Sequence, residues 1–337
     1  AVFRERHIPV VIGGLHATVC ADEAARHCDA VVVGEGESVW DEVLKDAQSQ
    51  SLRQIYRSAS DFDLTHSPMP RFDLLSGRAI PRWTLQTERG CPFACDFCGA
   101  SRLLGSFREK PIVRIRAELA EISRFSRRPW IELADDNTFA GGGDANELLA
   151  ALGEANVRYF TEADWRVGER PEILRHLAAS GCVQLLVGIE SLVFRYPGMG
   201  AKQAELKRIM DAVCAIQDAG VVVNGCFIVG ADGETNASLD RLIEFILASP
   251  LAEVQITLQT PFPGTSLYQR MKQTGRLIED RGWSYYTLFD VTYRPQPMTA
   301  EQLQRGFHRV IGAVVATAAA ERRSVLRKEI WRRNPRF

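Results

Sequence analysis

The sequence has almost no net charge and no long apolar run. Its 337 residues carry 41 Lys and Arg against 42 Asp and Glu, a formal net charge of -1, so the overall charge does not indicate a nucleic-acid partner. No run of 18 or more apolar residues is present, which excludes the usual signature of a membrane-spanning helix. With 46% hydrophobic and 25% charged residues, the composition is that of a globular protein with one large or two moderate domains.

Cysteine is scarce outside one short stretch. Five of the eight cysteines stand far apart in apolar surroundings: Cys20, Cys28, Cys182, Cys214 and Cys226. This scatter argues against a disulfide framework and indicates a reducing compartment, so we expect a cytoplasmic protein. Because cysteine is often buried, we expect Cys182, Cys214 and Cys226 to belong to the core.

The other three cysteines, Cys91, Cys95 and Cys98, follow an apolar segment that predicts a strand. A structural zinc site needs four protein ligands, and no other Cys or His lies between His66 and His176. Iron–sulfur clusters are held by thiolates, and three of them would leave one iron open to a small molecule. A zinc site and three unrelated buried cysteines remain the alternatives.

The spacing Cys-x3-Cys-x2-Cys, with Phe97 before the last cysteine, resembles the signature of radical S-adenosylmethionine (SAM) enzymes. The flanking residues resemble the subgroup with an N-terminal cobalamin-binding domain, and the resemblance covers almost the whole chain. It implies a [4Fe-4S] cluster held by Cys91, Cys95 and Cys98, with the amino and carboxylate groups of SAM on the open iron. One electron would split SAM into methionine and a 5′-deoxyadenosyl radical, or SAM would serve as a methyl source. Phe97 would pack near the adenine.

Two segments near the start, 8–14 and 29–37, each read as a buried strand that ends in a glycine turn and precedes a helix. This order predicts a parallel, doubly wound sheet, with ligands at the carboxyl ends of its strands. The segments resemble the last two strands of the family's cobalamin domain, whose glycine loops lie against the nucleotide tail of the corrinoid. The resemblance thereby assigns that role to Gly13, Gly14, Gly34, Glu35 and Gly36. An ordinary tight turn is the alternative.

The family's cobalamin domain usually opens with several more strands and an Asp-x-His-x-x-Gly loop, and no such motif occurs here. We therefore expect an N-terminally truncated chain whose cobalamin binding is doubtful. His16 and His27 are read as surface residues and not as cobalt ligands.

From Arg82 onward, apolar strand candidates alternate with amphipathic helices. The expected strands lie near 82–87, 130–134, 157–163, 183–189, 220–229 and 253–259, and the expected helices near 113–126, 144–154, 171–179, 203–219 and 236–248. Six such units predict an α/β protein with a parallel sheet, as a partial or full (β/α) barrel with its chemistry at the carboxyl ends of the strands. The family that the motif resembles has an open six-unit barrel.

The expected division of the chain has four parts. These are the C-terminal part of a cobalamin-binding-like domain at 1–46, a linker at 47–81, a radical SAM core barrel at 82–275, and a C-terminal extension with a basic helix at 276–337.

Polar residues at the predicted strand ends are candidate SAM contacts. Asp135 and Asp136 follow the second strand, where the alternative is a helix N-cap. The resemblance places them where the family binds the SAM amino group. Glu190 closes the fourth strand, and a lone carboxylate is rarely buried unless it is paired. Its Gly-x-Glu-Ser run resembles the family's, which implies that Glu190 contacts SAM and that Gly188 gives the cofactor clearance.

The resemblance also implies the reaction. We expect cobalamin-dependent methyl transfer to an unactivated carbon of an apolar or polycyclic molecule such as a hopanoid or a porphyrin. A radical oxidative cyclisation or rearrangement, and a non-catalytic iron–sulfur protein, are the alternatives. The expected partners are a small-molecule substrate and an electron donor such as a flavodoxin or ferredoxin, without nucleic acid. The basic C-terminal segment, Arg322 to Arg336, predicts a solvated helix face or contact with a membrane surface.

Overall fold

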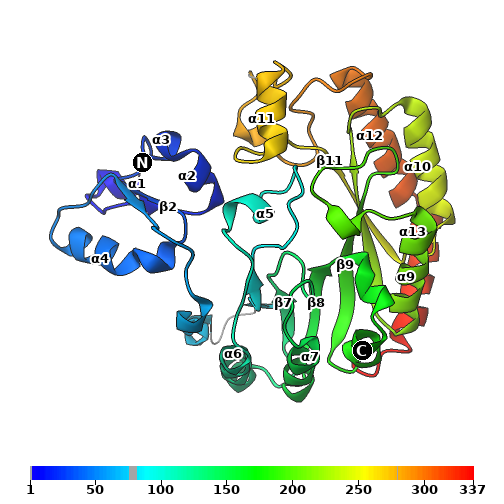
Figure 1. Ribbon diagram of the computed structural model, residues 1–337, viewed down its shortest axis with the longest axis horizontal. Helices are drawn as coiled ribbons and strands as arrows, with labels where there is room; N and C mark the ends of the chain where they lie inside the picture. The colour runs from blue at the N-terminus through cyan, green and yellow to red at the C-terminus, as the bar shows by residue number, and fades with distance from the viewer. Residues whose placement is uncertain (1, 76–81, 279) are drawn as a thin grey trace.

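The computed structural model describes residues 2–75, 82–278 and 280–337. Figure 1 shows a small N-terminal sheet, in blue, beside a larger sheet that carries most of the helices. The larger sheet has six parallel strands in the order β11-β10-β9-β8-β7-β4. Its strands are β4 (Trp83–Leu85), β7 (Trp130–Leu133), β8 (Arg158–Ala163), β9 (Cys182–Glu190), β10 (Val222–Val229) and β11 (Glu253–Leu258).

The helices between these strands lie close to their predicted positions. They are α6 (Ile112–Phe125), α7 (Ala145–Glu154), α8 (Pro171–Leu177), α9 (Leu206–Asp218) and α10 (Asn236–Ala248). A further helix, α11 (Ser266–Gln273), follows β11. The sheet is open, because β4 and β11 are its two edges. The predicted α/β class and partial six-stranded barrel are confirmed.

Alternation along each strand separates a packed face from a face that is free for chemistry. In β9, Leu185 and Val187 are buried in the main core, whereas Leu186 and Gly188 on the other face are only half buried. Successive side chains of a strand point to opposite faces. Residues of one parity therefore pack under the helices, and residues of the other parity line the concave side of the sheet.

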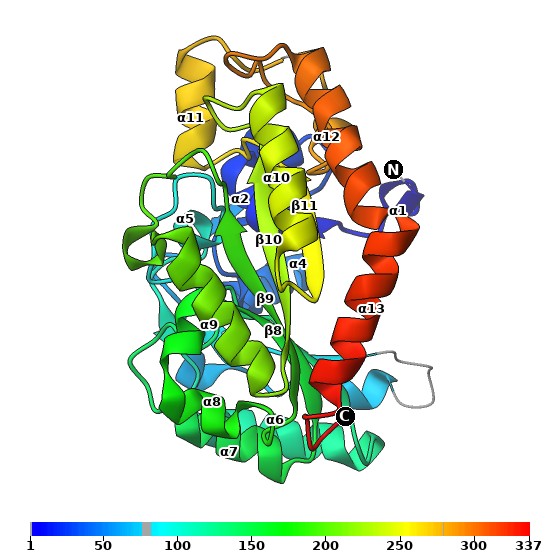
Figure 2. The same ribbon diagram turned by 90° about the vertical axis from the view of Figure 1, so that its right-hand side faces the viewer.

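Two further helices close the chain against this sheet. Figure 2 shows α9 and α10 over the sheet with α12 (Ala300–Val315) and α13 (Thr317–Trp331) beside them. A capping box formed by Thr299 and Gln302 begins α12. None of the helices in the described ranges has the length and apolar character needed to cross a membrane.

The basic residues of the C-terminal segment mostly bind the protein itself. Arg322 donates to the carbonyl oxygens of Leu247 and Ser249, and Arg327 pairs with Glu253 at 2.5 Å. The side-chain amide of Asn334 donates to the carbonyl oxygens of Cys182 (2.7 Å) and Gly220 (2.9 Å). The contacts of Arg322 and Arg327 dock α13 onto the end of α10 and the start of β11, and those of Asn334 fix the residues after α13 at the amino ends of β9 and β10. The segment is therefore part of the fold and not a free basic face.

The N-terminal sheet has three parallel strands, in the order β1-β2-β3. Its elements are α1 (Val2–Glu5), β1 (Val11–Ile12), α2 (Leu15–Val19), α3 (Ala21–Ala24), β2 (Ala30–Val33), α4 (Trp40–Gln48) and β3 (Ile55–Arg57). The predicted linker at 47–81 therefore begins too early, because it contains β3. The sequence concealed this strand because it is three residues long and its buried side chain is a single tyrosine, Tyr56. Residues 76–81 of the predicted linker lie outside the described ranges.

A two-stranded antiparallel ribbon connects β4 to the next helix. It consists of β5 (Glu88–Arg89) and β6 (Arg108–Glu109), with the cysteine loop and the short helix α5 (Ala100–Leu103) between them. The ribbon thereby holds both ends of the cysteine loop at one edge of the sheet.

Candidate functional site

A cavity of about 350 Å³ lies at the carboxyl ends of the large sheet. The loop between β5 and α5 contributes Cys91, Cys95, Phe97 and Cys98. The strands and the loops after them contribute Asp136, Asn137, Glu162, Gly188, Glu190, Lys202 and Cys226. The fold thus brings the three cysteines together with three of the four predicted SAM-contact residues at the sheet.

The backbone of the cysteine loop is held by contacts that do not involve the thiols. The amide of Ala94 donates to the carbonyl oxygen of Gly198 (3.1 Å), and the amide of Asp96 donates to that of Pro197 (3.0 Å). The buried Asp96 carboxylate forms an ion pair of 2.6 Å with Arg270 of α11. The loop is therefore shaped by the loop after β9 and by α11.

The spacing of the thiols bears on the zinc alternative. Within the described residues, the only three Cys, His, Asp or Glu side chains whose ligand atoms all lie within 4.8 Å of one another are His16, Cys20 and Glu23. In a tetrahedral zinc site, thiolate sulfurs would be separated by roughly 3.8 Å. The three loop cysteines are therefore too widely spaced for one ion, and a multi-iron cluster suits them better.

The two adjacent aspartates have different environments. Asp135 is buried, and its Oδ1 accepts the amides of Thr87 (2.7 Å) and Glu88 (3.0 Å). It does not line the cavity, whereas Asp136 does. Burial and then the charge of Asp135 raise the pKa of Asp136 to about 6. Asp135 therefore anchors the ribbon that leads into the cysteine loop, and Asp136 is the carboxylate that can meet a ligand.

Glu190 and Lys202 form the charged side of the cavity. Burial raises the pKa of the Glu190 carboxyl, and the Lys202 ammonium opposes that shift. Burial alone would lower the pKa of Lys202, but the charges of Glu190, Cys95 and Cys91 raise it. Glu190 has a left-handed backbone with φ of 68°, and a Cβ on Gly188 would lie 2.2 Å from its Oε1. Gly188 is therefore needed for the Glu190 carboxylate to fold back over the strand.

Phe97 lies against an aromatic wall beside the thiols. Its ring meets the buried ring of Tyr196 edge-on, with the centroids 4.7 Å apart. Both rings belong to a small cluster of buried side chains that includes Cys95 and Met199. Phe97 thus lines the cavity and also packs against Tyr196.

Comparison with known proteins gives this arrangement a family. Residues 85–246 match the model of the Radical SAM superfamily. These residues form a radical SAM domain. The predictions of a radical SAM domain and of an enzyme are confirmed.

Two relatives match most of this chain and are longer than it. The bacteriochlorophyllide d C-12(1)-methyltransferase of Chlorobaculum tepidum is 27% identical over 309 residues, which cover 88% of this chain and 67% of that protein. The hopanoid C-2 methylase of Rhodopseudomonas palustris is 27% identical over 290 residues, which cover 81% of this chain and 54% of that protein. The chain therefore spans between half and about two thirds of the length of these relatives.

A solved structure shares the fold. The radical SAM methyltransferase TsrM from Kitasatospora setae, solved with cobalamin and a [4Fe-4S] cluster bound, superposes with a TM-score of 0.69 at 14% identity. The match covers 94% of this chain and 74% of that chain. At this identity the likeness concerns the fold alone.

Three residues of the radical SAM domain cavity were missed or misjudged from the sequence. Asn137 donates its side-chain amide to Asp164 (3.2 Å) and toward the sulfur of Cys91 (3.9 Å). Cys226 lines the cavity and is half buried, so its expected place in the core is wrong. Its even position in β10 is the signal that would have placed it on the concave face. Lys202 sits in a loop without periodicity, and the sequence offered no signal for it.

The five residues predicted to meet a corrinoid are elsewhere, in the loops after β1 and β2. Gly14 and Gly34 have φ of 101° and 88°, which glycine adopts readily. Among the described residues, no atom lies within 4 Å of a Cβ added at Gly14 or Gly36, whereas a Cβ at Gly13 approaches Val32 and one at Gly34 approaches Ser58. Two of these four glycines therefore leave open space beside the loops.

Glu35 binds the radical SAM domain instead of facing open space. Its Oε1 accepts from Arg89 (2.7 Å) and Arg108 (3.0 Å), and its Oε2 accepts from Arg108 (2.8 Å) and from the amide of Phe62. Burial acts against the charge, but the two arginines keep the pKa of Glu35 below its usual range. Glu35 thus joins the glycine loop after β2 to both strands of the ribbon that holds the cysteine loop.

We expect Glu35→Gln to lower the free energy of unfolding by about 2–3 kcal/mol, because it removes the carboxylate that pairs with the largely buried guanidinium of Arg108 and leaves Arg89 with the carboxylate of Glu37. Thermal unfolding measures this loss. Glu37→Gln is the matched control, because Glu37 is more exposed and makes one ion pair, with Arg89 at 2.7 Å, for which about 1 kcal/mol or less is expected. Equal effects of the two substitutions would contradict the assignment of Glu35 as the main link.

Proposed function

We propose that the protein uses a [4Fe-4S] cluster, held by Cys91, Cys95 and Cys98, to bind and reductively cleave SAM. The observation that carries this proposal is the single cavity that joins these cysteines to Asp136, Glu190 and a lysine. A cluster bound there would supply the electron that cleaves the sulfonium. The donor set fits such a cluster, because it consists of three spaced thiols on an anchored loop.

The side chains around the cysteines suit the charges of SAM. Asp136 and Glu190 would receive its ammonium group, and Lys202 would pair with its carboxylate. Asn137 would donate a hydrogen bond to the Cys91 sulfur, which tunes a cluster from outside its ligands. Phe97 would pack against the adenine, while Asp135 supports the site from behind.

We propose methyl transfer to an unactivated carbon of an apolar or polycyclic substrate as the reaction, with cobalamin as the methyl carrier. Two relatives support this proposal, because they are named as a bacteriochlorophyllide methyltransferase and a hopanoid methylase. The cobalamin bound in TsrM supports the choice of methyl carrier. Gly14 and Gly36 leave room for a ligand to approach, and the corrinoid contacts would come from these glycines and not from Glu35. Residues 1–46 and β3 together would form the part of a cobalamin domain that this chain contains.

A cytoplasmic protein donor such as a flavodoxin or ferredoxin would reduce the cluster in this proposal. The cytoplasmic location and the protein donor are proposed for the same reason, because an iron–sulfur cluster and reduced cysteines both require a reducing environment.

The test is anaerobic reconstitution with iron and sulfide, followed by reduction in the presence of SAM. Formation of 5′-deoxyadenosine or S-adenosylhomocysteine supports the enzyme. S-adenosylhomocysteine that appears only with added methylcobalamin and a candidate tetrapyrrole or hopanoid supports methyl transfer. 5′-Deoxyadenosine with an oxidised and unmethylated substrate would favour the cyclisation alternative. An intact cluster that yields neither product would contradict the proposal.

We expect Lys202→Gln to weaken SAM binding by about tenfold, because a hydrogen-bonded charge pair contributes roughly 1.5–3 kcal/mol. Equilibrium binding of SAM to the reconstituted protein measures this change. Lys207→Gln is the matched control, because the exposed Lys207 pairs with Asp211 on α9 and does not line the cavity. Unchanged affinity in Lys202→Gln would remove Lys202 from the site.

A further inference from the structure

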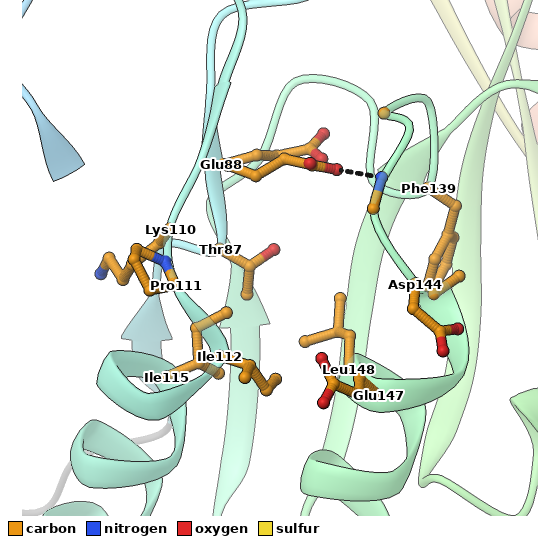
Figure 3. A pocket seen from close by; sticks show the side chains of 14 residues that line it. Thr87, Glu88, Lys110, Pro111, Ile112, Ile115, Phe139, Asp144, Glu147 and Leu148 are labelled. Carbon is orange, nitrogen blue, oxygen red and sulfur yellow. Dashed lines mark hydrogen bonds between the residues drawn. The ribbon is translucent and has the colours of Figure 1, made fainter. Parts of the chain in front are cut away.

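A second cavity is lined by residues of the β5–β6 ribbon, and none of the three loop cysteines lines it. It has a volume of about 260 Å³ and lies between the first turns of α6 and α7. Figure 3 shows Glu88 and Thr87 on one side of this cavity, and Ile112, Ile115 and Leu148 at its base. Its volume is slightly below the usual range for drug-sized ligands, so it suits a smaller molecule.

The carboxyl group of Glu88 is buried at this cavity and, within the part of the chain that the structure describes, lacks a hydrogen-bond partner for one of its oxygens. The residue is only 5% exposed, and its buried Oε1 has no hydrogen-bond partner among the described residues. Buried polar groups are nearly always hydrogen-bonded, because leaving one unpaired costs free energy. A group in the cavity that supplied a hydrogen bond or a positive charge would remove this cost.

The surroundings of Glu88 are acidic. Glu88 pairs with Glu109 across the antiparallel ribbon, so the two side chains emerge side by side, an arrangement that disfavours two like charges. Burial, and then the charges of Asp135, Glu109 and Asp136, raise the pKa of Glu88 to about 9. The cation of this region, Lys110, is already engaged in a buried ion pair of 2.8 Å with Glu118.

The remaining walls indicate what kind of cation fits. Ile112, Ile115, Phe139 and Leu148 are apolar, and a metal ion would need several oxygen ligands in their place. Among the described residues, no three His, Cys, Asp or Glu side chains of this cavity bring their ligand atoms within 4.8 Å of one another. Asp144 and Glu147 are exposed and also line the cavity, so their charge would attract cations toward it.

We propose that this cavity binds a small primary ammonium ion with a short apolar body, whose nitrogen lies between Glu88 and Glu109. The apolar body would contact Ile112, Ile115 and Leu148. Because these residues lie outside the cluster cavity, the binding does not depend on SAM or on the cluster. It goes beyond the proposed radical chemistry and can be tested separately from it.

The test is calorimetric titration of the full chain with propylammonium chloride, at a pH between 4.5 and 9. We expect saturable binding to one site, whereas 1-propanol, KCl and MgCl2 should give none. Binding should release a proton from Glu88, which appears as a dependence of the heat on the ionisation enthalpy of the buffer. Equal binding of 1-propanol, or binding of Mg²⁺ or K⁺ without propylammonium, would overturn the proposal.

Glu88→Gln should weaken propylammonium binding by at least about tenfold, since it removes the charge that the ammonium ion pairs with. Glu121→Gln is the control, because Glu121 lies on α6, whose first turn lines the cavity, but is itself outside the cavity and pairs with Arg124. Binding by Glu88→Gln that equals that of the parent protein would also overturn the proposal.

Thermal unfolding of Glu88→Gln distinguishes a loss of propylammonium binding from a loss of folding. Because the pKa of Glu88 is raised from 4.5 to about 9 in the folded state, the parent protein loses stability as the pH rises between these values. Glu88→Gln has no such loss. We therefore expect it to unfold at a higher temperature than the parent near the upper limit of this range, and at the same temperature below pH 4.5. A lower unfolding temperature across the range would contradict the raised pKa.

Discussion

Cys95→Ser is expected to remove the iron–sulfur cluster and with it all cleavage of SAM. Changes outside the ligand shell of a metal site already cost about 10–100-fold in affinity or activity, so loss of a ligand should exceed a hundredfold. Iron and sulfide content after anaerobic reconstitution, followed by assay of 5′-deoxyadenosine, measures the effect. Cys95 is buried beside Tyr196 and Met199. A solvent molecule therefore cannot easily take the place of its thiolate in the variant.

Cys226→Ser is the control for this prediction. Cys226 lines the same cavity from β10 but is not part of the three-cysteine loop, so the variant should keep its full iron and sulfide. If Cys226→Ser lost the cluster and Cys95→Ser retained it, the assignment of the ligands would be wrong.

Gly198→Ala is expected to disrupt the cysteine loop without any change at the cysteines. Gly198 has φ of 83°, and a Cβ there would lie 1.9 Å from the carbonyl oxygen of Ala94. A left-handed conformation costs a non-glycine residue roughly 1–2 kcal/mol, and forced displacement of backbone typically adds 1–3 kcal/mol. We therefore expect a loss of about 2–5 kcal/mol in the free energy of unfolding, and a reduced iron content after reconstitution.

Gly142→Ala is the matched control. In the part of the chain that the structure describes, no atom lies within 4 Å of a Cβ added at Gly142, so the effect of this substitution on stability should stay within about 0.5 kcal/mol. Chemical denaturation of both variants compares the two. A Gly198→Ala protein as stable as the parent, with full iron content, would show that the loop after β9 does not shape the cysteine loop.

The sequence predicted the large sheet well because its signals were long and regular. Strands β7 to β11 and helices α6 to α10 each carry a clear apolar alternation or stripe, and their bounds lie close to the predicted ranges. Strands of two or three residues, such as β3, β5 and β6, carry no such period. They were fixed by pairing with distant segments, which a single sequence does not reveal.

Part of the candidate site was predictable, because some of its residues lie in local sequence motifs or at positions that strand alternation defines. Its cysteines and Glu190 lie in local motifs, and the parity of the strands could have separated the two aspartates. Ile131 and Leu133 of β7 are buried, so Asp135 continues their face and Asp136 the concave one. Lys202 and the ion pairs of Glu35 depend on loops that meet only in the folded chain.

The central claim is that the three-cysteine loop holds a cluster with one iron open to SAM. The direct measurement is electron paramagnetic resonance of the reconstituted and reduced protein, recorded with and without SAM. We predict a signal typical of a reduced [4Fe-4S] cluster that changes when SAM is added to the parent protein, and no such signal in Cys95→Ser. A cluster signal that SAM leaves unaltered, or stoichiometric zinc without sulfide, would contradict this account.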